Sequence, residues 1–390
     1  MGNDETKMNL TRENTTLVNL IKLGQAFGAG SIRCVKIYNI LKENNLLNNI
    51  FSKESLYNVI EEKYADKILN VKDETADKII NDCIKENISI ITPEDSNYPE
   101  RLRSIDDMPV VLFCKGKLPD VDNEPIISIV GPRKISEFGK KAAYSLSKRV
   151  AKAGFIVASG GALGADTCAH KGALACGGKT IAVLGCGICY DYLPENRKMR
   201  EQIAENGCVL SEHPPYASTT KYAFPIRNRI VSALSLGTVV IEAGTKSGAL
   251  ITARLANEQG RDVFVIPGNP TFDEYKGSNA LLRDGAFPLL DASDIFNQYI
   301  SKFPDKIDIE KAFCEDNSTP KNEKNLKKLP LGLSKEAEIV YNNLNNAKFT
   351  VDDLLGLGIS DDDLLSALTE LEIEHLIKAC PGGSYELLSN

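Results

Sequence analysis

Residues 126–161 read IISIVGPRKISEFGKKAAYSLSKRVAKAGFIVASGG, and this stretch decides the fold class. Two short apolar runs, IISIV and FIVAS, stand on either side of a segment with the periodicity of a helix. In each run the apolar residues are mostly consecutive and do not alternate with polar ones. We therefore expect both faces of each strand to be buried. The stretch therefore predicts a β–α–β unit with a parallel pair of strands.

The same alternation continues to residue 296. The later apolar runs are TIAVLGC, CVLSEH, TVVIEAG, DVFVIPG and PLLD, and helical segments such as PENRKMREQIAENG and GALITARLANEQG separate them. Residues 91 to 120, which are rich in proline, are interpreted as a lead-in strand with loops. We expect residues 91–296 to form an α/β domain with an extended Rossmann-like, doubly wound, mostly parallel sheet.

The two outer parts differ from this domain in composition. Residues 1–90 carry helical periodicity and predict a helical N-terminal domain. Within it, FGAGSIR at 27–33 is a glycine-containing break that either presents N–H groups to a phosphate or is only a tight connection, and we favour the connection. Residues 297–330 are polar and predict a linker.

Residues 331–390 show three helical patterns followed by a short ribbon, which is the plan of a winged-helix domain. The helix before the ribbon is acidic. Its acidic residues are Asp361, Asp362, Asp363, Glu370, Glu372 and Glu374. Because phosphates would repel this helix, a protein-interaction or regulatory role is favoured over reading of a DNA groove.

Composition excludes several classes of protein. The chain has 390 residues and contains no apolar run near the roughly 20 residues that a membrane-spanning helix needs. The polar start, MGNDETKMNLTRENTT, has no signal core, so we expect a cytoplasmic protein. Ten cysteines are scattered without a disulfide framework, which indicates reduced thiols.

Net charge argues at first against a nucleic-acid partner. The chain has 46 basic and 53 acidic residues, a net charge of −7, whereas phosphate binding needs a basic surface. However, much of the acid lies in the outer parts, and several cations are expected near one edge of the sheet. These are Arg133, Lys134, Lys221, Arg227 and Arg229. Because this basic surface is small, we expect one protomer to bind nucleic acid with modest affinity. Dimerisation and cooperative binding along a nucleic-acid strand are expected to increase the affinity.

Ligands of an open parallel sheet bind beyond the carboxyl ends of its strands. Three loops at this edge, residues 131–136, 159–166 and 244–248, are rich in glycine and lead into helices. Glycine lets the backbone approach an anion, and free N–H groups at a helix start favour negative charge. We expect a phosphate-accepting rim there. Its candidate residues are Gly131, Arg133, Gly161, Lys246 and Ser247.

Nucleotide cofactors are disfavoured. The first loop lacks the G-x-G-x-x-G order of dinucleotide-binding folds, and no G-x-x-x-x-G-K-[ST] string of P-loop enzymes occurs. No cofactor is therefore predicted.

The richest cluster of binding residues is KYAFPIRNR at 221–229. Lys221, Arg227 and Arg229 are suited to backbone phosphates, and Phe224 can stack a base, which contributes about 1–3 kcal/mol. In the alternative, Phe224 and Tyr222 belong to the core and the arginines form caps or ion pairs. For Arg229, which lies just inside a helix, the two interpretations are balanced.

Catalytic and metal-binding patterns are weak. His170 follows Asp166 by four residues, and a structural pair is favoured over a catalytic one. A zinc site needs more than the thiols of Cys186 and Cys189, with Cys208 and His213 farther along the chain, so no metal is predicted. Nothing in the spacing singles out Glu212 or Glu242, which end strands. No catalytic residue is predicted.

These motifs resemble the DprA (Smf) family of DNA-processing proteins. The similar runs are, in chain order, SIVGPRKISEFG, ASGGALGADTCAH, TIAVLGCGICYDYLPENRKM, SEHPPYASTTKYAFPIRNRIVSALS, VVIEAGTKSGALITARLANEQGRDVFVIPGNP and SNALLRDGA. The resemblance covers residues 91–296, and FP-x-RNRI with SGALITARLA is highly specific. The flanks are more weakly similar to the family's helical N-terminal domain, of the SAM or helix–hairpin–helix type, and to its winged-helix domain.

The resemblance implies a non-enzymatic protein that binds incoming single-stranded DNA in natural transformation, protects it and loads the recombinase RecA. It also implies a homodimer formed through the Rossmann-like domain. The family's G-x-R loop falls on Gly131 and Arg133, its pocket lysine and aromatic residue on Lys221 and Phe224, and its R-N-R cations on Arg227 and Arg229.

The chain departs from the family in two places: Glu374-His375 stands where a glycine is usual, and Cys189 replaces other residues in its loop. The function of the C-terminal part therefore stays open.

Two other functions remain as alternatives. A nucleotide-binding enzyme of the related phosphoribohydrolase superfamily would need P-G-G-x-G-T-x-x-E where this chain has IEAGTKSGAL, which lacks the acid after Thr245. A transcription factor would need a winged helix that attracts duplex DNA, and the acidic helix argues against it.

Overall fold

The computed structural model describes residues 14–313, 333–344, 348–354, 359–374, 376–380 and 384–387. The chain divides into two compact units, Met1–Cys314 and Glu315–Asn390. Each unit is considered separately.

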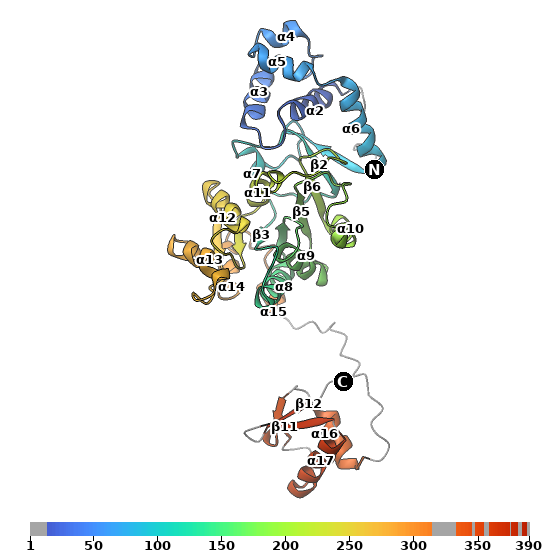
Figure 1. The fold of residues 1–390 in the computed structure, drawn as a ribbon, viewed down its shortest axis with the longest axis vertical. Coiled ribbons are helices and arrows are strands. Elements are labelled where there is room, and N and C mark those ends of the chain that lie inside the picture. The colour runs from blue at the N-terminus through green and yellow to red at the C-terminus, as the bar shows by residue number, and fades with distance from the viewer. Residues whose placement is uncertain are drawn as a thin grey trace. The chain divides into compact units, whose positions relative to one another are not determined.

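The first unit is built on a nine-stranded sheet of order β1-β2-β6-β5-β4-β3-β7-β8-β9 (Figure 1). Strands β3 to β9 run parallel, and the β1–β2 and β2–β6 pairs are antiparallel. The strands are β1 Ile88–Ile91, β2 Leu112–Gly116, β3 Ile126–Val130, β4 Ile156–Ser159, β5 Thr180–Leu184, β6 Cys208–Ser211, β7 Gly237–Val240, β8 Asp262–Val265 and β9 Phe287–Pro288. The predicted mostly parallel α/β sheet is confirmed.

Helices cover both faces of this sheet. Alternate residues of β3 belong to different cores, since Ile127 and Ile129 pack with α8, α9 and α14, whereas Ile126 and Val130 belong to the core shared with α10, α11 and α12. The helices are α8 Glu137–Lys152, α9 Ala165–Ala175, α10 Arg197–Asn206, α11 Ala223–Ala233, α12 Gly248–Glu258, α13 Asp273–Arg283 and α14 Ser293–Tyr299. The apolar runs of the strands follow from this burial on both faces.

Strand order reverses next to β3, which pairs with β4 on one side and β7 on the other. Chain connections leave β4 and β7 in opposite directions along the sheet. Such a switch point opens a crevice at the carboxyl ends of the strands, where ligands bind in sheets of this kind.

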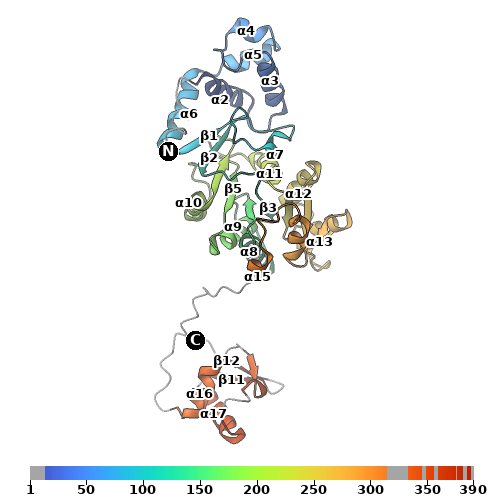
Figure 2. The same ribbon diagram turned by 180° about the vertical axis from the view of Figure 1, so that it is seen from behind.

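The N-terminal helices gather beyond the β1–β2 end of the sheet (Figures 1 and 2). They are α2 Thr15–Phe27, α3 Ile32–Glu43, α4 Lys53–Tyr57, α5 Glu62–Leu69 and α6 Asp73–Glu86. Their buried side chains, such as Leu20 and Leu23, share one apolar core with Leu112 of β2. The domain border at residue 90 stays a prediction.

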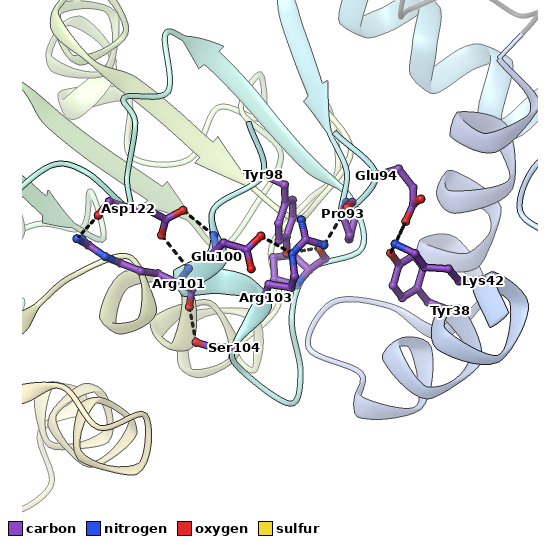
Figure 3. Close-up of polar contacts among 11 residues, drawn as sticks. Tyr38, Lys42, Pro93, Glu94, Tyr98, Glu100, Arg101, Arg103, Ser104 and Asp122 are labelled. Atoms are coloured by element: carbon purple, nitrogen blue, oxygen red, sulfur yellow. Dashed lines mark hydrogen bonds and ion pairs between the residues drawn. The ribbon is translucent and has the colours of Figure 1, made fainter. Parts of the chain in front are cut away.

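Polar contacts join α3 to the segment after β1, and others join the next helix of the chain to the rest of the domain (Figure 3). The Tyr38 hydroxyl donates to the Glu94 carboxylate, and the Lys42 ammonium lies 2.8 Å from the same group. In α7, Glu100–Arg103, the buried Arg101 guanidinium donates to the carbonyl oxygens of Asp122, Glu124 and Leu234 at 3.1–3.2 Å. Burial lowers the pKa of Arg101 to about 10.

The predicted linker is too long at its start. Phe303, Ile307 and Ala312 are buried in the core under the sheet, and α15, Ile309–Phe313, packs on α8. The Asp308 N–H donates to the Ala153 carbonyl oxygen at 2.9 Å. These few apolar residues bind the segment to the domain although its composition is polar. Residues 314–330 of the predicted linker lie outside the described residues.

The second unit has a small core of its own. Its elements are α16 Lys335–Asn343, β10 Lys348–Thr350, a 3-10 turn Asp352–Leu354, α17 Asp361–Ile373, β11 Ile377–Cys380 and β12 Ser384–Leu387. The strands form an antiparallel sheet of order β10-β12-β11. Where a middle helix was predicted, the described residues contain only the 3-10 turn. His375, one of the departures from the family pattern, lies outside the described residues.

No helix among the described residues is long and apolar enough to cross a lipid bilayer.

We expect Arg101→Ala to lower the free energy of unfolding by about 2–4 kcal/mol, because three carbonyl groups lose the buried cation that pairs with them. Arg254→Ala is the matched control, since the Arg254–Glu258 ion pair is exposed to solvent. This control should lose at most about 1 kcal/mol. Urea unfolding measures both values, and equal losses would contradict the anchoring role of Arg101.

Candidate nucleic-acid interface

A pocket of about 400 Å³ lies at the switch point, beyond the carboxyl ends of β3 and β4. It opens between the loop after β3, the loop after β4, and the starts of α11 and α12. Its polar and glycine lining residues include Gly131, Arg133, Gly160, Asp166, Lys221, Arg227, Asn228, Gly248 and Thr252, and Phe224 adds an aromatic ring. Five residues that the sequence assigned to DNA binding thus come together here: Gly131, Arg133, Lys221, Phe224 and Arg227.

Arg133 and Phe224 form the mouth of the pocket. The exposed Arg133 guanidinium lies over the Phe224 ring, 4.6 Å from its centroid. The Tyr192 ring packs against the same phenylalanine at 5.2 Å between centroids, tilted by 40°. Phe224 is half-buried by these contacts, so a base can stack on the covered face only when Arg133 moves off the ring.

Arg227 places a buried positive charge in the wall of the pocket. Its Nη1 donates to the Gly160 carbonyl oxygen, and its Nε donates to Asn228 Oδ1 at 3.2 Å. Asp166 lies behind it and accepts from the Ala162 N–H at 3.2 Å; burial raises the pKa of this carboxyl, with Arg227 opposing the effect. Arg227 therefore both holds the loop after β4 and lines the pocket.

Gly160 is required for this arrangement. A Cβ atom at this position would come within 2.4 Å of Arg227 Nη2 and 2.6 Å of Asp166 Oδ2. Any other residue would push the buried guanidinium away from the loop.

The loop that carries Gly131 and Arg133 is held from below by Glu242. This carboxylate is fully buried and accepts from the Ser136 N–H at 2.8 Å and from the Ser136 hydroxyl at 2.6 Å. The Ser136 hydroxyl oxygen in turn accepts from the Gly139 N–H and caps α8. Glu242 is therefore a structural clamp, and its oxygens are already occupied.

Lys246 and Ser247 lie next to the pocket. A second hollow of about 670 Å³ shares Pro132, Arg133 and Gly248 with the first and extends over the start of α12. Ser247 caps α12 by accepting from the Ala249 N–H at 3.3 Å.

Gly161 does not line either hollow. Its φ of +67° is a left-handed conformation that favours glycine, and it shapes the turn behind the pocket. Its carbonyl oxygen accepts from Asn196 Nδ2 at 3.3 Å.

Arg229 is not brought to the pocket. Its side chain is only 2% exposed and lies between Glu212, at 2.8 Å, and Asp107, at 3.1 Å. The predicted DNA contact by Arg229 is thus replaced by an internal ion pair. Successive helix residues are rotated by about 100°, so residues two apart such as Arg227 and Arg229 leave a helix on nearly opposite sides.

The glycine-containing hairpin at 27–33 contacts the carboxylate of the Arg229–Glu212 ion pair. The Gly30 N–H donates to Glu212 Oε1 at 3.2 Å, so the anion that it binds is a carboxylate of the chain itself. The favoured interpretation of this hairpin as a tight connection agrees with this contact.

Asn228 is a pocket residue that the sequence interpretation missed. It stands in the middle of the R-N-R run, where attention went to the two arginines, and its amide both lines the pocket and accepts from Arg227. Its spacing could have indicated it, because Asn228 follows Phe224 by four positions and therefore lies on the same side of α11.

The remaining catalytic candidates have structural partners. His170 is fully buried, and its Nδ1 lies 2.7 Å from the Thr180 hydroxyl rather than pairing with Asp166. Among the residues that the structure describes, no group of three or more His, Cys, Asp or Glu side chains could hold a metal ion. Cys186 and Cys208 are buried free thiols, and Cys189 is partly buried.

Comparison with known proteins points to one family. Residues 89–300 match the family model described as DNA recombination-mediator protein A. Protein Smf from Synechocystis is 40% identical over 214 residues, which are 54% of this chain and 54% of that protein. The DNA processing protein DprA of Bacillus subtilis is 39% identical over 215 residues, 55% of this chain and 72% of that protein. The match thus spans about half the length of the Synechocystis relative.

Two solved structures extend the similarity to the fold. The X-ray structure of DNA processing protein A from Streptococcus pneumoniae aligns with a TM-score of 0.63 and 31% identity, over 72% of this chain and 97% of that one. The Helicobacter pylori DNA processing protein A, described for its single-stranded DNA binding mode, aligns with a TM-score of 0.50 and 32% identity. This alignment covers 55% of the present chain and 96% of the Helicobacter pylori chain.

The buried histidine behind the pocket predicts a pH dependence of stability. Burial, aided by Arg227, lowers the pKa of His170 to about 3, against 6.5 for an exposed histidine. As the pH falls below 6.5, His170 binds a proton in the unfolded chain but stays neutral in the folded chain. The free energy of unfolding therefore decreases by up to about 1.4 kcal/mol per pH unit. Between pH 6.5 and 5 this amounts to roughly 2 kcal/mol.

His170→Asn, which cannot titrate, should lose this component. Urea unfolding of both proteins at pH 7 and pH 5 measures the difference. The same pH dependence in both would contradict the prediction.

Proposed function

The chain belongs to the DNA recombination-mediator protein A family, and we propose that it binds single-stranded DNA in the pocket at the switch point of its sheet. The observation that carries the proposal is the meeting of Arg133, Lys221 and Arg227 with the Phe224 ring around one hollow. Cations suit the phosphates, and an aromatic face stacks a base of any identity.

The positions of the cations suggest how a strand is bound. Arg227 is fixed and buried, so it requires no ordering when a phosphate arrives. Arg133 and Lys221 are exposed and free to reorient. When the Arg133 guanidinium moves from the Phe224 ring to a phosphate, the ring face becomes available to a base. Binding then exchanges a cation–π contact for an ion pair and a stack.

The shape of the hollows favours a polynucleotide over a single nucleotide. The pocket continues into the second hollow over the start of α12, where Lys246 adds positive charge and Lys276 is paired with Asp273 at 2.5 Å. Neighbouring phosphates of one strand can therefore occupy both hollows, with Arg133 between them. The dipole of α12, whose positive end lies at the start of the helix, favours an anion there.

Beyond strand binding, we propose that the protein acts in natural transformation, where it protects incoming DNA and loads RecA as a cytoplasmic homodimer. The family to which residues 89–300 belong is a family of recombination mediators. Phe287 and Leu290, in and next to the short edge strand β9, are exposed, and these apolar side chains offer a surface that a second chain can cover. In this proposal the C-terminal unit is a winged-helix domain that contacts protein rather than DNA, as its acidic α17 indicates.

A nucleotide-hydrolysing enzyme is the second candidate, and the geometry disfavours it. Glu242, the acid that ends β7 nearest the pocket loops, is buried with both oxygens bonded to Ser136. It is therefore not free to activate water. Release of free base from a panel of nucleoside monophosphates would establish the enzyme and overturn the non-enzymatic proposal.

We expect Arg133→Ala combined with Lys221→Ala to weaken binding of oligo-dT at least tenfold. The variant should also flatten the dependence of the binding constant on salt, because fewer counterions are released from the DNA. Fluorescence anisotropy at several salt concentrations measures both effects. Arg254→Ala on the exposed face of α12, where Arg254 pairs with Glu258, is the matched control and should bind like the parent. Parental binding by the double variant would show that the pocket is not the DNA site.

The same double variant tests the RecA step. On strands coated with single-strand-binding protein, the parent should accelerate RecA filament formation and the double variant should not. Stimulation by the variant equal to that by the parent would separate RecA loading from this pocket.

A further inference from the structure

We propose that the surface where α8 and α9 meet binds the part of a single DNA strand that extends beyond the pocket. We call this surface the α8–α9 seam. Its exposed cations and its aromatic residue are Lys134, Lys140, Lys141, Lys171 and Tyr144. The inference rests on the proposed function and extends the DNA site from one pocket to a longer surface.

The segment that builds the seam is basic, unlike the chain as a whole. Residues 131–180 contain nine Lys or Arg residues and two acidic residues, whereas the whole chain has a net charge of −7. Of the two acids, Asp166 is buried in the wall of the pocket, and Glu137 is exposed and pairs with Lys140 at 2.5 Å. The excess of positive charge fits a polyanion.

The helices α8 and α9 lie side by side and run in the same direction, since each follows a strand of the parallel β3–β4 pair (Figure 1). The Ser147 hydroxyl of α8 donates to the Ala169 carbonyl oxygen of α9. Gly172 permits this close packing, because a Cβ atom there would lie 2.3 Å from the Tyr144 carbonyl oxygen. Exposed side chains of the two helices therefore share one continuous surface.

Cations from both helices meet around Cys168. Burial raises the pKa of this half-buried thiol, and the Lys171 and Lys140 ammonium groups oppose the effect, so both lie near it. Tyr144 follows Lys140 by four residues on the same side of α8 and is 40% exposed. An exposed ring among lysines is the combination that binds single strands of any sequence.

Several of these cations are available to a ligand. Among the residues that the structure describes, no carboxylate forms an ion pair with Lys134, Lys141 or Lys171. Lys148 and Lys152, farther along α8, are half-buried and already have interaction partners, so the proposed contacts are assigned to the first three lysines.

The seam begins at the pocket. The loop after β3, which contributes Arg133 to the pocket, leads into α8, and the loop after β4, which contributes Ala162, leads into α9. The two loops touch, because a Cβ atom on Gly164 would lie 2.3 Å from the Pro132 carbonyl oxygen. Lys134 is exposed directly after Arg133. This continuity identifies the occupant as the strand bound in the pocket.

The length of the seam makes binding depend on the length of the strand. With 16 residues, α8 extends about 24 Å from the pocket loops. Sites for single strands range from about 4 to 16 nucleotides. A short strand therefore occupies the pocket alone, and only a long strand also reaches Lys141, Tyr144 and Lys171.

The first test compares oligo-dT of about 6 and about 16 nucleotides by fluorescence anisotropy. Lys141→Ala combined with Lys171→Ala should weaken binding of the long strand about tenfold. The slope of log binding constant against log salt should become shallower by about 1.4 for that strand, because two phosphates lose their cations. Binding of the short strand should not change.

Lys36→Ala combined with Lys85→Ala is the matched control. It removes the same charge from exposed positions on α3 and α6, outside the seam and the pocket. This variant should bind strands of both lengths like the parent, which separates a local contact from an effect of net charge.

The second test uses the absence of tryptophan from the chain. Tyr144→Trp places a single fluorophore on the seam. The long strand should quench its emission, whereas the short strand should bind without quenching. Equal quenching by bound short and long strands would contradict a site that only the long strand reaches.

The outcomes separate this inference from the proposed function. If the Arg133/Lys221 double variant loses binding but the Lys141/Lys171 double variant binds both lengths like the parent, the seam is not a DNA site and the pocket stands. An equal loss for short and long strands in the Lys141/Lys171 variant would assign these lysines to the pocket or the fold and overturn the inference. If the parent binds neither strand, the proposed function falls and the inference with it.

Discussion

Two buried arginines of α11 organise the region around the pocket. Arg227 joins the helix to the loop after β4 through Gly160, and Arg229 joins it to Glu212, Asp107 and, through Glu212, the Gly30 hairpin. Burial of a guanidinium is unfavourable unless its N–H groups donate to oxygen atoms. The position of each arginine therefore constrains the segments that carry its oxygen partners. The helix that carries Phe224, directly after Lys221, is thereby held from both sides.

This constraint links the N-terminal helices to the pocket. Their apolar core is continuous with that of the sheet, and Tyr38 and Lys42 of α3 both contact Glu94 after β1 (Figure 3). Arg101 also reaches the carbonyl oxygen of Leu234, at the end of α11. The middle and the C-terminal end of α11 are thus tied to segments that precede β3 in the chain. The long Arg133 and Lys221 side chains at the mouth of the pocket are exposed, whereas α11 is held by these buried contacts.

The acidic total of the chain and a DNA-binding site are compatible because charges act locally. Around the pocket, Arg133 and Lys221 are exposed, whereas the nearby carboxylates of Asp166 and Glu242 are buried and bonded. At physiological ionic strength, salt screens the repulsion between a bound phosphate and exposed acidic side chains that lie more than about 10 Å from it. A bound strand therefore meets a small basic surface.

The sequence alone determined the α/β sheet, its parallel core and the loops that surround the pocket, because these follow from patterns only a few residues long. Apolar runs predict buried strands, and glycines before helices predict anion sites, without knowledge of distant segments. Only the tertiary structure decided what each charged side chain meets. Arg227 and Arg229 are the same residue type in one short motif. Arg227 lines the pocket, whereas Arg229 is buried in ion pairs with Glu212 and Asp107. Likewise, Phe303 and Ile307 bind a polar segment to the core that composition alone assigned to a linker. The physical reason is that burial and ion pairing depend on residues far apart in the chain, which the fold brings together.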